Sequence, residues 1–282
     1  MASALTRTLE PGITSNRFIM VVTPLASAVA GLGALLTGDG FQEAIPFGLG
    51  SGGVAFIAWA AARELDPDHP LSAGTAALIA APLVVIGSPD LLGPGLVVLI
   101  GRLVAGTTGR LPTRADVIVL VVGAGLVAYR DVGPAFVSVA TVGVIAVAVL
   151  EPRVRGRMLL AAAGMAGSAA VIGWLAGRSP TGPATPGGGA LVLLWAGCAV
   201  AMVSLVVLGR VVAHADSASG GFVQTRRVRV ARATVAAAAV APWLWVGAAG
   251  VTPSIALWAA LAGTVAGWGV RPLLNRRPLS VP

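Results

Sequence analysis

The sequence lacks most of what a soluble protein displays on its surface. Only 11% of its 282 residues are charged, against about 25% in soluble domains. Lysine is absent, so all 19 basic residues are arginine, and aromatic residues make up only 5% of the chain. Because a soluble chain of this length could not cover its surface with so few charges, we expect an integral membrane protein.

Other absences narrow the class of membrane protein. The apolar residues do not alternate in segments of about ten, the pattern of a transmembrane barrel. They fall instead in long runs, and within hydrocarbon a helix satisfies its own backbone hydrogen bonds. The sequence therefore predicts an all-α fold, a polytopic transmembrane helical bundle that forms a single integral membrane domain over residues 1–282.

Residues that would carry familiar cofactor chemistry are also scarce. The only cysteine, Cys198, lies in an apolar run, and the only histidines, His69 and His214, lie in predicted loops. A haem within the bilayer needs axial ligands inside helices, so no haem is expected. Neither a P-loop nor a zinc-binding HExxH motif occurs, and no carboxylate lies at the centre of a predicted span, where ion-coupled transporters often place one.

About ten apolar segments have the length that a bilayer requires. Proline or glycine marks several of their boundaries, and nine or eleven spans stay open because some segments are short. The first segment is too long for a signal peptide and is expected to remain as a span. The predicted spans are 18–36, 46–62, 71–88, 90–106, 115–130, 132–150, 157–176, 190–213, 231–250 and 252–270.

The distribution of arginine predicts how these spans are threaded. With ten spans and a cytoplasmic N-terminus, seventeen arginines fall inside and only Arg130 and Arg178 fall outside. Cytoplasmic loops carry such an excess of basic residues, so both termini are expected to be cytoplasmic, in the cell membrane. The same rule accounts for the net charge of +8, and no nucleic-acid partner is expected.

Small and aromatic residues predict how the helices pack and where they meet the interface. Glycine pairs four residues apart favour close helix crossings; they are Gly48 and Gly52, Gly173 and Gly177, and Gly263 and Gly267. Tryptophan is typical of membrane interfaces, and Trp59, Trp174, Trp195 and Trp268 are therefore expected to be interface anchors.

An acidic hinge follows the second predicted span, in the sequence RELDPDHP at 63–70. Its prolines restrict the backbone, and Mg²⁺ in proteins takes one or two carboxylates and completes its shell with water and phosphate. If the protein is an enzyme, this hinge predicts a Mg²⁺ site made of Glu64, Asp66, Asp68 and His69.

A basic segment, residues 101–116, is the next cytoplasmic stretch. A guanidinium group can donate two parallel hydrogen bonds to the oxygens of one phosphate. An acidic loop beside a basic loop is therefore an arrangement expected to bind the headgroup of a phosphorylated lipid or isoprenoid. The predicted substrate or phosphate ligands are Arg102, Thr107, Thr108, Arg110, Arg114 and Asp116.

Purely structural roles also account for the same residues, and more simply. Asp116 near the start of a helix is favoured by the helix dipole as a cap, and Arg102 can extend toward the interface. Glu64 can form an ion pair with a residue of a neighbouring loop, and the Asp-Pro sequence is common in turns. The structural and the functional interpretation both stay open at this point.

Three classes of function remain. Ten spans and glycine-rich faces favour a permease-like transporter. A membrane enzyme acting on a phosphate-bearing lipid at the cytoplasmic face is the second, and a non-catalytic subunit of a membrane complex is the third. The expected partners are the bilayer, anionic lipid headgroups at the basic loops, and either further copies of the chain or other subunits.

Overall fold

The structure, a computed structural model, describes residues 3–86, 89–176, 197, 201, 203–205, 211–213, 215 and 221–274. The long elements of these residues are all helices, which confirms the predicted all-α class. The α-helices are α1 (Thr14–Leu36), α2 (Phe41–Leu65), α3 (Pro70–Leu83), α4 (Leu92–Ala105), α5 (Arg114–Ala128), α6 (Gly133–Leu150), α7 (Arg155–Leu175), α9 (Thr225–Val246) and α10 (Val251–Leu274). Short 3-10 turns adjoin some of them: η1 (Val84–Ile86), η2 (Pro152–Val154) and η3 (Gly247–Gly250).

Each helix coincides with a predicted span to within a few residues. Nine of the ten predicted ranges overlap these nine helices, and the range 190–213 lies largely outside the described residues. Five helical stretches of the described chain are long and apolar enough to cross a membrane, namely α1, α2, α6, residues 152–175 and α10 up to Val270. The helices α3 and α4 are apolar but shorter. These apolar helices are consistent with a membrane protein.

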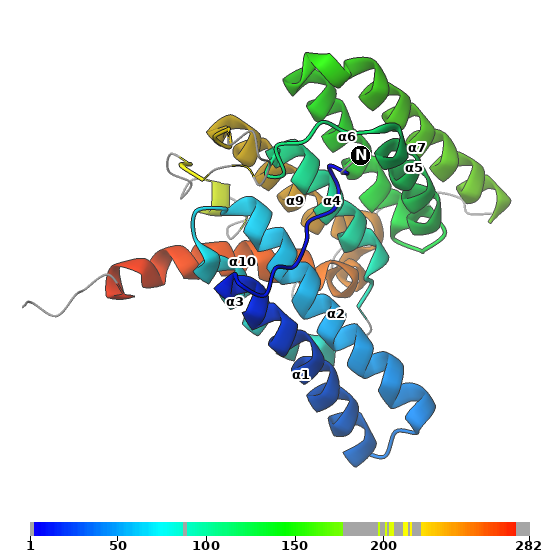
Figure 1. Ribbon diagram of the computed structural model, residues 1–282. Coiled ribbons are helices and arrows are strands. Elements are labelled where there is room, and N and C mark those ends of the chain that lie inside the picture. The colour runs from blue at the N-terminus through cyan, green and yellow to red at the C-terminus, as the bar shows by residue number, and fades with distance from the viewer. Residues whose placement is uncertain are drawn as a thin grey trace, which may run out of the picture.

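The helices form two groups that α4 and α9 connect (Figure 1). On one side α2 packs against α1, α3 and α10, and on the other side α7 packs against α5 and α6. The helix α4 contacts α2, α5, α6 and α9, so it lies between the groups. The α1–α2 hairpin extends away from the rest of the bundle.

Two of the three predicted glycine faces form close helix crossings. A Cβ atom added to Gly48 or Gly52 would lie 2.6 Å from a backbone oxygen of α1, and one added to Gly263 or Gly267 would clash with α3. The third expectation is wrong for Gly173 in α7, because a Cβ atom added there would meet no atom of the described residues within 4 Å. Its partner in the predicted pair, Gly177, lies outside the described residues.

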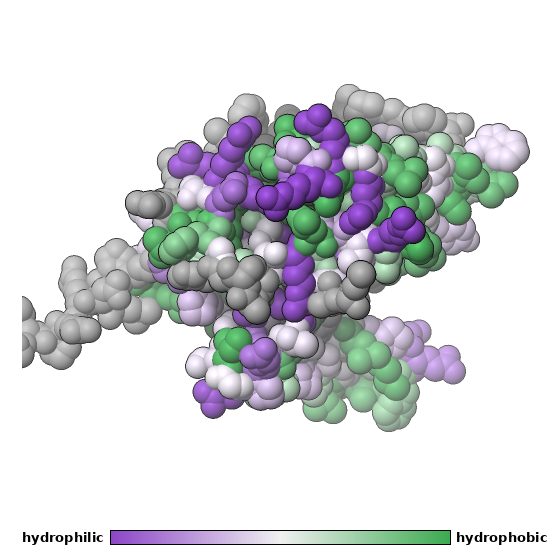
Figure 2. All heavy atoms as spheres, turned by 45° about the horizontal axis from the view of Figure 1, so that its top comes forward, coloured by the Kyte–Doolittle hydropathy of each residue, from purple (hydrophilic) through white to green (hydrophobic). Residues whose placement is uncertain are grey.

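Charged residues gather at one end of the bundle. Three arginines from separate parts of the chain, Arg110, Arg153 and Arg227, line one small cavity together with Glu151. Figure 2 shows hydrophilic residues across this end and hydrophobic residues on the flanks. Such an arrangement is the one that the predicted threading requires for the loops on one side of a membrane.

Candidate functional site

The site is built at the ends of α2 and α4, where the apolar sequence of each helix gives way to charge. Arg63 and Glu64 lie in the last turn of α2, and Arg102 lies in the last turn of α4. The helix α4 ends at Gly106, whose φ of 70° is the left-handed conformation that glycine adopts most readily at a helix end. The turn brings the hydroxyl group of Thr107 back to α2.

Glu64 is the centre of a buried ionic cluster. Its side chain is 1% exposed, and its Oε1 accepts a hydrogen bond of 2.7 Å from Nε of Arg102. Thr107 donates its hydroxyl group to Oε2, and Nη1 of Arg7 lies 3.6 Å from Oε1. A buried carboxylate is stable only with such partners. The structure thus joins the acidic hinge to the basic segment 101–116, as the sequence led us to expect.

The N-terminal segment, residues 3–10, runs past α4 and α2 (Figure 1) and contacts the cluster through Arg7 and the Leu5 carbonyl. Ala4 and Leu5 are buried although they lie near the start of the chain. The Leu5 carbonyl accepts a hydrogen bond of 2.6 Å from Nη1 of Arg102. The Ser3 hydroxyl and the Ala4 N–H both donate to the Asp116 carboxylate. The segment is therefore fastened to α4 and α5 and carries Arg7 into the site.

Asp116 has a structural role at the start of α5. It forms a capping box with Thr113, whose backbone N–H donates to Asp116 at 2.7 Å and whose hydroxyl accepts from the Asp116 N–H. The capping role predicted for Asp116 is confirmed. A carboxylate with these donors has little capacity left for a substrate.

The remaining acidic residues of the hinge do not come together. Asp66 accepts hydrogen bonds from Ser72 at 2.5 Å and from Nδ1 of His69 at 2.9 Å, whereas Asp68 accepts from the backbone N–H groups of residues 212 and 213. Within the part of the chain that the structure describes, no three His, Cys, Asp or Glu side chains lie close enough to hold a metal ion. The four residues predicted for Mg²⁺ thus bind separate partners, and the structure does not bring all four together in one group.

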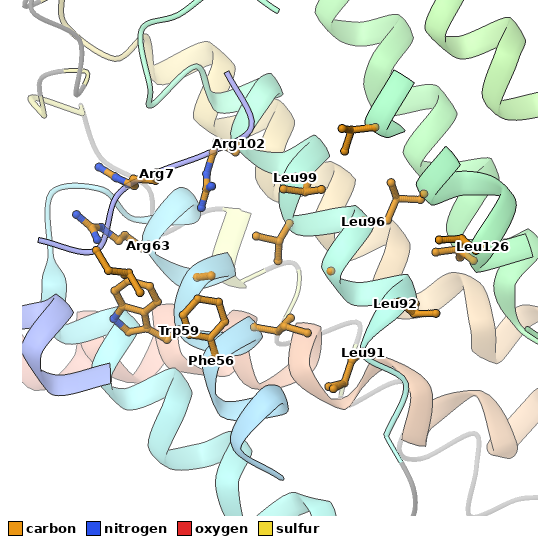
Figure 3. A pocket seen from close by; sticks show the side chains of 18 residues that line it. Arg7, Phe56, Trp59, Arg63, Leu91, Leu92, Leu96, Leu99, Arg102 and Leu126 are labelled. Atoms are coloured by element: carbon orange, nitrogen blue, oxygen red, sulfur yellow. The ribbon is translucent and has the colours of Figure 1, made fainter. Parts of the chain in front are cut away.

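An apolar cavity of about 450 Å³ lies beside the ionic cluster, between α2, α4 and α5 (Figure 3). Its volume is within the range of about 300–1,000 Å³ typical of small-molecule sites. Most of its wall is aliphatic, with Phe56 and Trp59 from α2. Three arginines line one end, Arg7, Arg63 and Arg102, and the leucines at the start of α4 line the other. The cavity is thus apolar along its length and cationic at one end.

The cavity reaches the apolar flank of the bundle between α4 and α5. Its lining includes Leu92, Val119 and Leu126, which are 47%, 49% and 57% exposed. The rim of the cavity on this flank is therefore apolar.

A second, polar cavity of about 400 Å³ adjoins the cationic end. Arg7 and Arg63 line both cavities, and Arg110, Thr108 and Glu10 also line the polar one. Of the predicted phosphate ligands, Thr108 and Arg110 line the polar cavity, and Arg102 lines the apolar one. The other three do not line either cavity. Thr107 binds Glu64 in the ionic cluster, Asp116 caps α5, and Arg114 is exposed at the first residue of α5.

Trp59 corrects one expectation from the sequence. It is not an interface anchor, because its side chain is only 3% exposed and its Nε1 donates to the Ser15 hydroxyl at 3.0 Å. The guanidinium of Arg63 lies 5.3 Å from the centre of its ring, and Phe56 packs beside it. The spacing of Phe56, Trp59 and Arg63 by three and four residues does predict one helix face, and that signal could have identified this wall of the cavity.

Two arginines at the start of α9 hold the ends of α2 and α4. Arg227 donates from Nε and Nη2 to the carbonyls of Val104 and Leu103, each at 2.9 Å, and Arg232 donates from Nε to the Leu65 carbonyl at 2.7 Å. Burial lowers the pKa of the Arg227 guanidinium, and the nearby Glu151 carboxylate opposes this shift. These contacts fix the two helix ends that carry the site.

Comparison with known proteins gives no relative from which a function could be inferred. No family model, no curated protein and no solved structure matches this chain.

Proposed function

We propose that this protein binds an amphiphilic lipid with a phosphate-bearing headgroup and acts on it as a permease-like carrier. The observation that carries the proposal is the cavity between α2, α4 and α5, which is apolar along its length and lined by three arginines at one end. These two parts match the two parts of an anionic amphiphile, because its chain packs against apolar side chains and its headgroup binds cations.

The apolar part of the cavity supports a lipid chain as its occupant. The residues beyond the arginines are aliphatic or aromatic, so a lipid chain that moves from the bilayer into the cavity stays in apolar surroundings. The exposed leucines at the rim connect the cavity with the apolar flank, through which a lipid could enter from the bilayer.

The net positive charge at the cationic end supports a phosphate group as the headgroup that binds there. Four arginines line the two cavities there, namely Arg7, Arg63, Arg102 and Arg110. Against them stand Glu64, which pairs with Arg102, and Glu10, so four positive and two negative charges leave an excess of two. A phosphate monoester carries a charge of about −1.5 to −2 at neutral pH and accepts paired hydrogen bonds from guanidinium groups.

Binding of matched ligands to the purified protein tests the proposal. We expect hexadecyl phosphate to bind at least about tenfold more tightly than hexadecanol, because charge-assisted hydrogen bonds contribute about 1.5–3 kcal/mol each. The variant Arg63→Met should lose most of this preference. Arg17→Met is the matched control, since Arg17 is exposed on α1 and does not belong to the cavity lining. Equal affinity of the wild-type protein for the two ligands would refute the proposal.

An enzyme acting on the same lipid is a second candidate, and one observation favours it. His69 is 41% exposed while its Nδ1 is held by the buried Asp66 carboxylate, the arrangement that orients an imidazole for proton transfer. In proteoliposomes, appearance of intact hexadecyl phosphate in the opposite leaflet would support the carrier. Its chemical conversion, lost in His69→Asn, would support the enzyme.

A further inference from the structure

Two of the arginines at the cavity are already occupied by an anion of the protein itself. Arg7 and Arg102 line the apolar cavity, and both lie beside the Glu64 carboxylate, at 3.6 Å and 2.7 Å. Their side chains are only 16% and 12% exposed, so little water reaches them. An incoming headgroup therefore meets guanidinium groups whose donors are directed in part toward Glu64.

We propose that Glu64 is an internal counter-anion that competes with the headgroup of the ligand for Arg7 and Arg102, and that it thereby sets the affinity and charge selectivity of the cavity. This inference rests on the proposed binding of a phosphate-bearing amphiphile. Glu64 keeps the arginines paired before a ligand binds, which avoids the cost of isolated buried charges. A phosphate group with more negative charge than one carboxylate displaces it, whereas a singly charged or neutral headgroup does not.

The exchange is coupled to the N-terminal segment, residues 3–10. Arg7 belongs to this segment, and Arg102 holds the segment through the Leu5 carbonyl at 2.6 Å. When Arg7 and Arg102 turn toward a headgroup, this hydrogen bond and the contact with Glu64 are both given up. The segment then keeps the contacts of Ser3 and Ala4 with Asp116, and these open more often because Arg102 no longer holds Leu5 in place. Binding therefore loosens the cover of the site.

The variant Glu64→Gln tests the competition. Glutamine preserves the shape of the side chain and can still accept from Thr107, but it removes the charge that competes for the arginines. Its affinity for hexadecyl phosphate should rise about tenfold, and its affinity for hexadecanol should not change. Glu43→Gln is the control, because Glu43 lies exposed in the first turn of the same helix, and it should leave both affinities unchanged.

The opposite sign of the effect would overturn the inference. If Glu64 only positions the arginines, Glu64→Gln will bind hexadecyl phosphate more weakly than, or as strongly as, the wild-type protein. This result is distinct from failure of the proposed function, in which the wild-type protein itself shows no preference for phosphate over alcohol.

A measurement on the wild-type protein decides the matter if Glu64→Gln does not fold. The backbone N–H groups of Ala4 and Leu5 donate to Asp116 and to the Ser3 hydroxyl. Hexadecyl phosphate should accelerate their hydrogen exchange at least about threefold, because the segment loosens, and hexadecanol should have no effect. Unchanged or slower exchange in the presence of bound hexadecyl phosphate would contradict the displacement of Glu64.

Discussion

At the scale of single residues, the arginines of this chain divide into those that hold the fold and those available to a ligand. Arg227 and Arg232 donate to carbonyl groups at the ends of α4 and α2, where the helix dipole favours a cation. In the sequence they belong to the same basic cluster as the exposed Arg226 and Arg229. Within this cluster, the arginines that hold the fold differ from the exposed ones in the side of α9 on which they lie.

Substitutions of neighbouring arginines on α9 should therefore differ in how much they lower the free energy of unfolding. Arg227→Met removes the donors to Leu103 and Val104 and leaves Glu151 without that cation, so we expect the free energy of unfolding to fall by about 2–3 kcal/mol. Arg226→Met, on the exposed side of α9, should change it by less than about 0.5 kcal/mol. Thermal unfolding of the two variants in the same detergent measures the difference, and equal midpoints would show that Arg227 does not hold α4.

Some residue roles could be predicted from the sequence and others could not. The capping role of Asp116 follows from its place near the start of a helix, where the dipole favours a carboxylate, and pairing of Glu64 with a neighbouring loop is one of the expected structural roles. The contribution of Arg7 was missed because it depends on where the segment 3–10 lies, and no local pattern specifies that. The division of the Mg²⁺ ligands likewise depends on distant partners, such as the backbone at 212 and 213 that binds Asp68.

At the scale of elements, glycine spacing predicts which helices approach closely. Gly48 and Gly52 in α2 allow the backbone of α1 to come within contact distance, and Gly263 and Gly267 do the same for α10 and α3. The prediction is wrong for Gly173 because a small residue permits a close approach without requiring one. Whether a neighbour lies there depends on the packing of the whole bundle.

The α1–α2 crossing can be tested with a matched pair of alanines. Gly52→Ala would place a Cβ atom against the Ser27 hydroxyl oxygen and 2.6 Å from the Thr23 carbonyl oxygen, and we expect it to destabilise the protein by about 1–3 kcal/mol. Gly33→Ala in the same hairpin meets nothing within 4 Å and should be neutral or stabilising by up to about 1 kcal/mol. A smaller cost at Gly52 than at Gly33 would mean that the crossing is not close.

At the scale of the whole molecule, composition and arginine asymmetry predict the class and the arrangement of charge. The helical class is confirmed, and residues from the ends of α2, α4 and α6 and from the starts of α5 and α9 do lie at one end of the bundle. The count of ten spans, the cytoplasmic termini, the cell membrane and assembly into a complex or homo-oligomer stay predictions. The cavity itself could not be predicted, because its wall combines the N-terminal segment and α2 with α4 and α5, which follow only after α3.

The predicted cytoplasmic location of both termini can be tested directly. Cysteine residues added at each terminus should both be labelled by an impermeant maleimide only from the cytoplasmic side, because an even number of spans returns the chain to the leaflet that holds its arginines. A variant carrying Cys198→Ala removes the only native thiol and serves as the background. Labelling of the two ends from opposite compartments would show an odd number of spans.

The central claim, that an amphiphile lies between α2, α4 and α5 with its phosphate at the arginines, is tested most directly by locating a bound ligand. A hexadecyl phosphate with a photoreactive diazirine near the middle of its chain should label residues of the cavity wall, such as Phe56, Leu96 and Leu99. Unlabelled hexadecyl phosphate should compete with this labelling at a concentration at least about tenfold lower than hexadecanol. Labelling confined to the outer face of the bundle, or equal competition by the alcohol, would contradict the account.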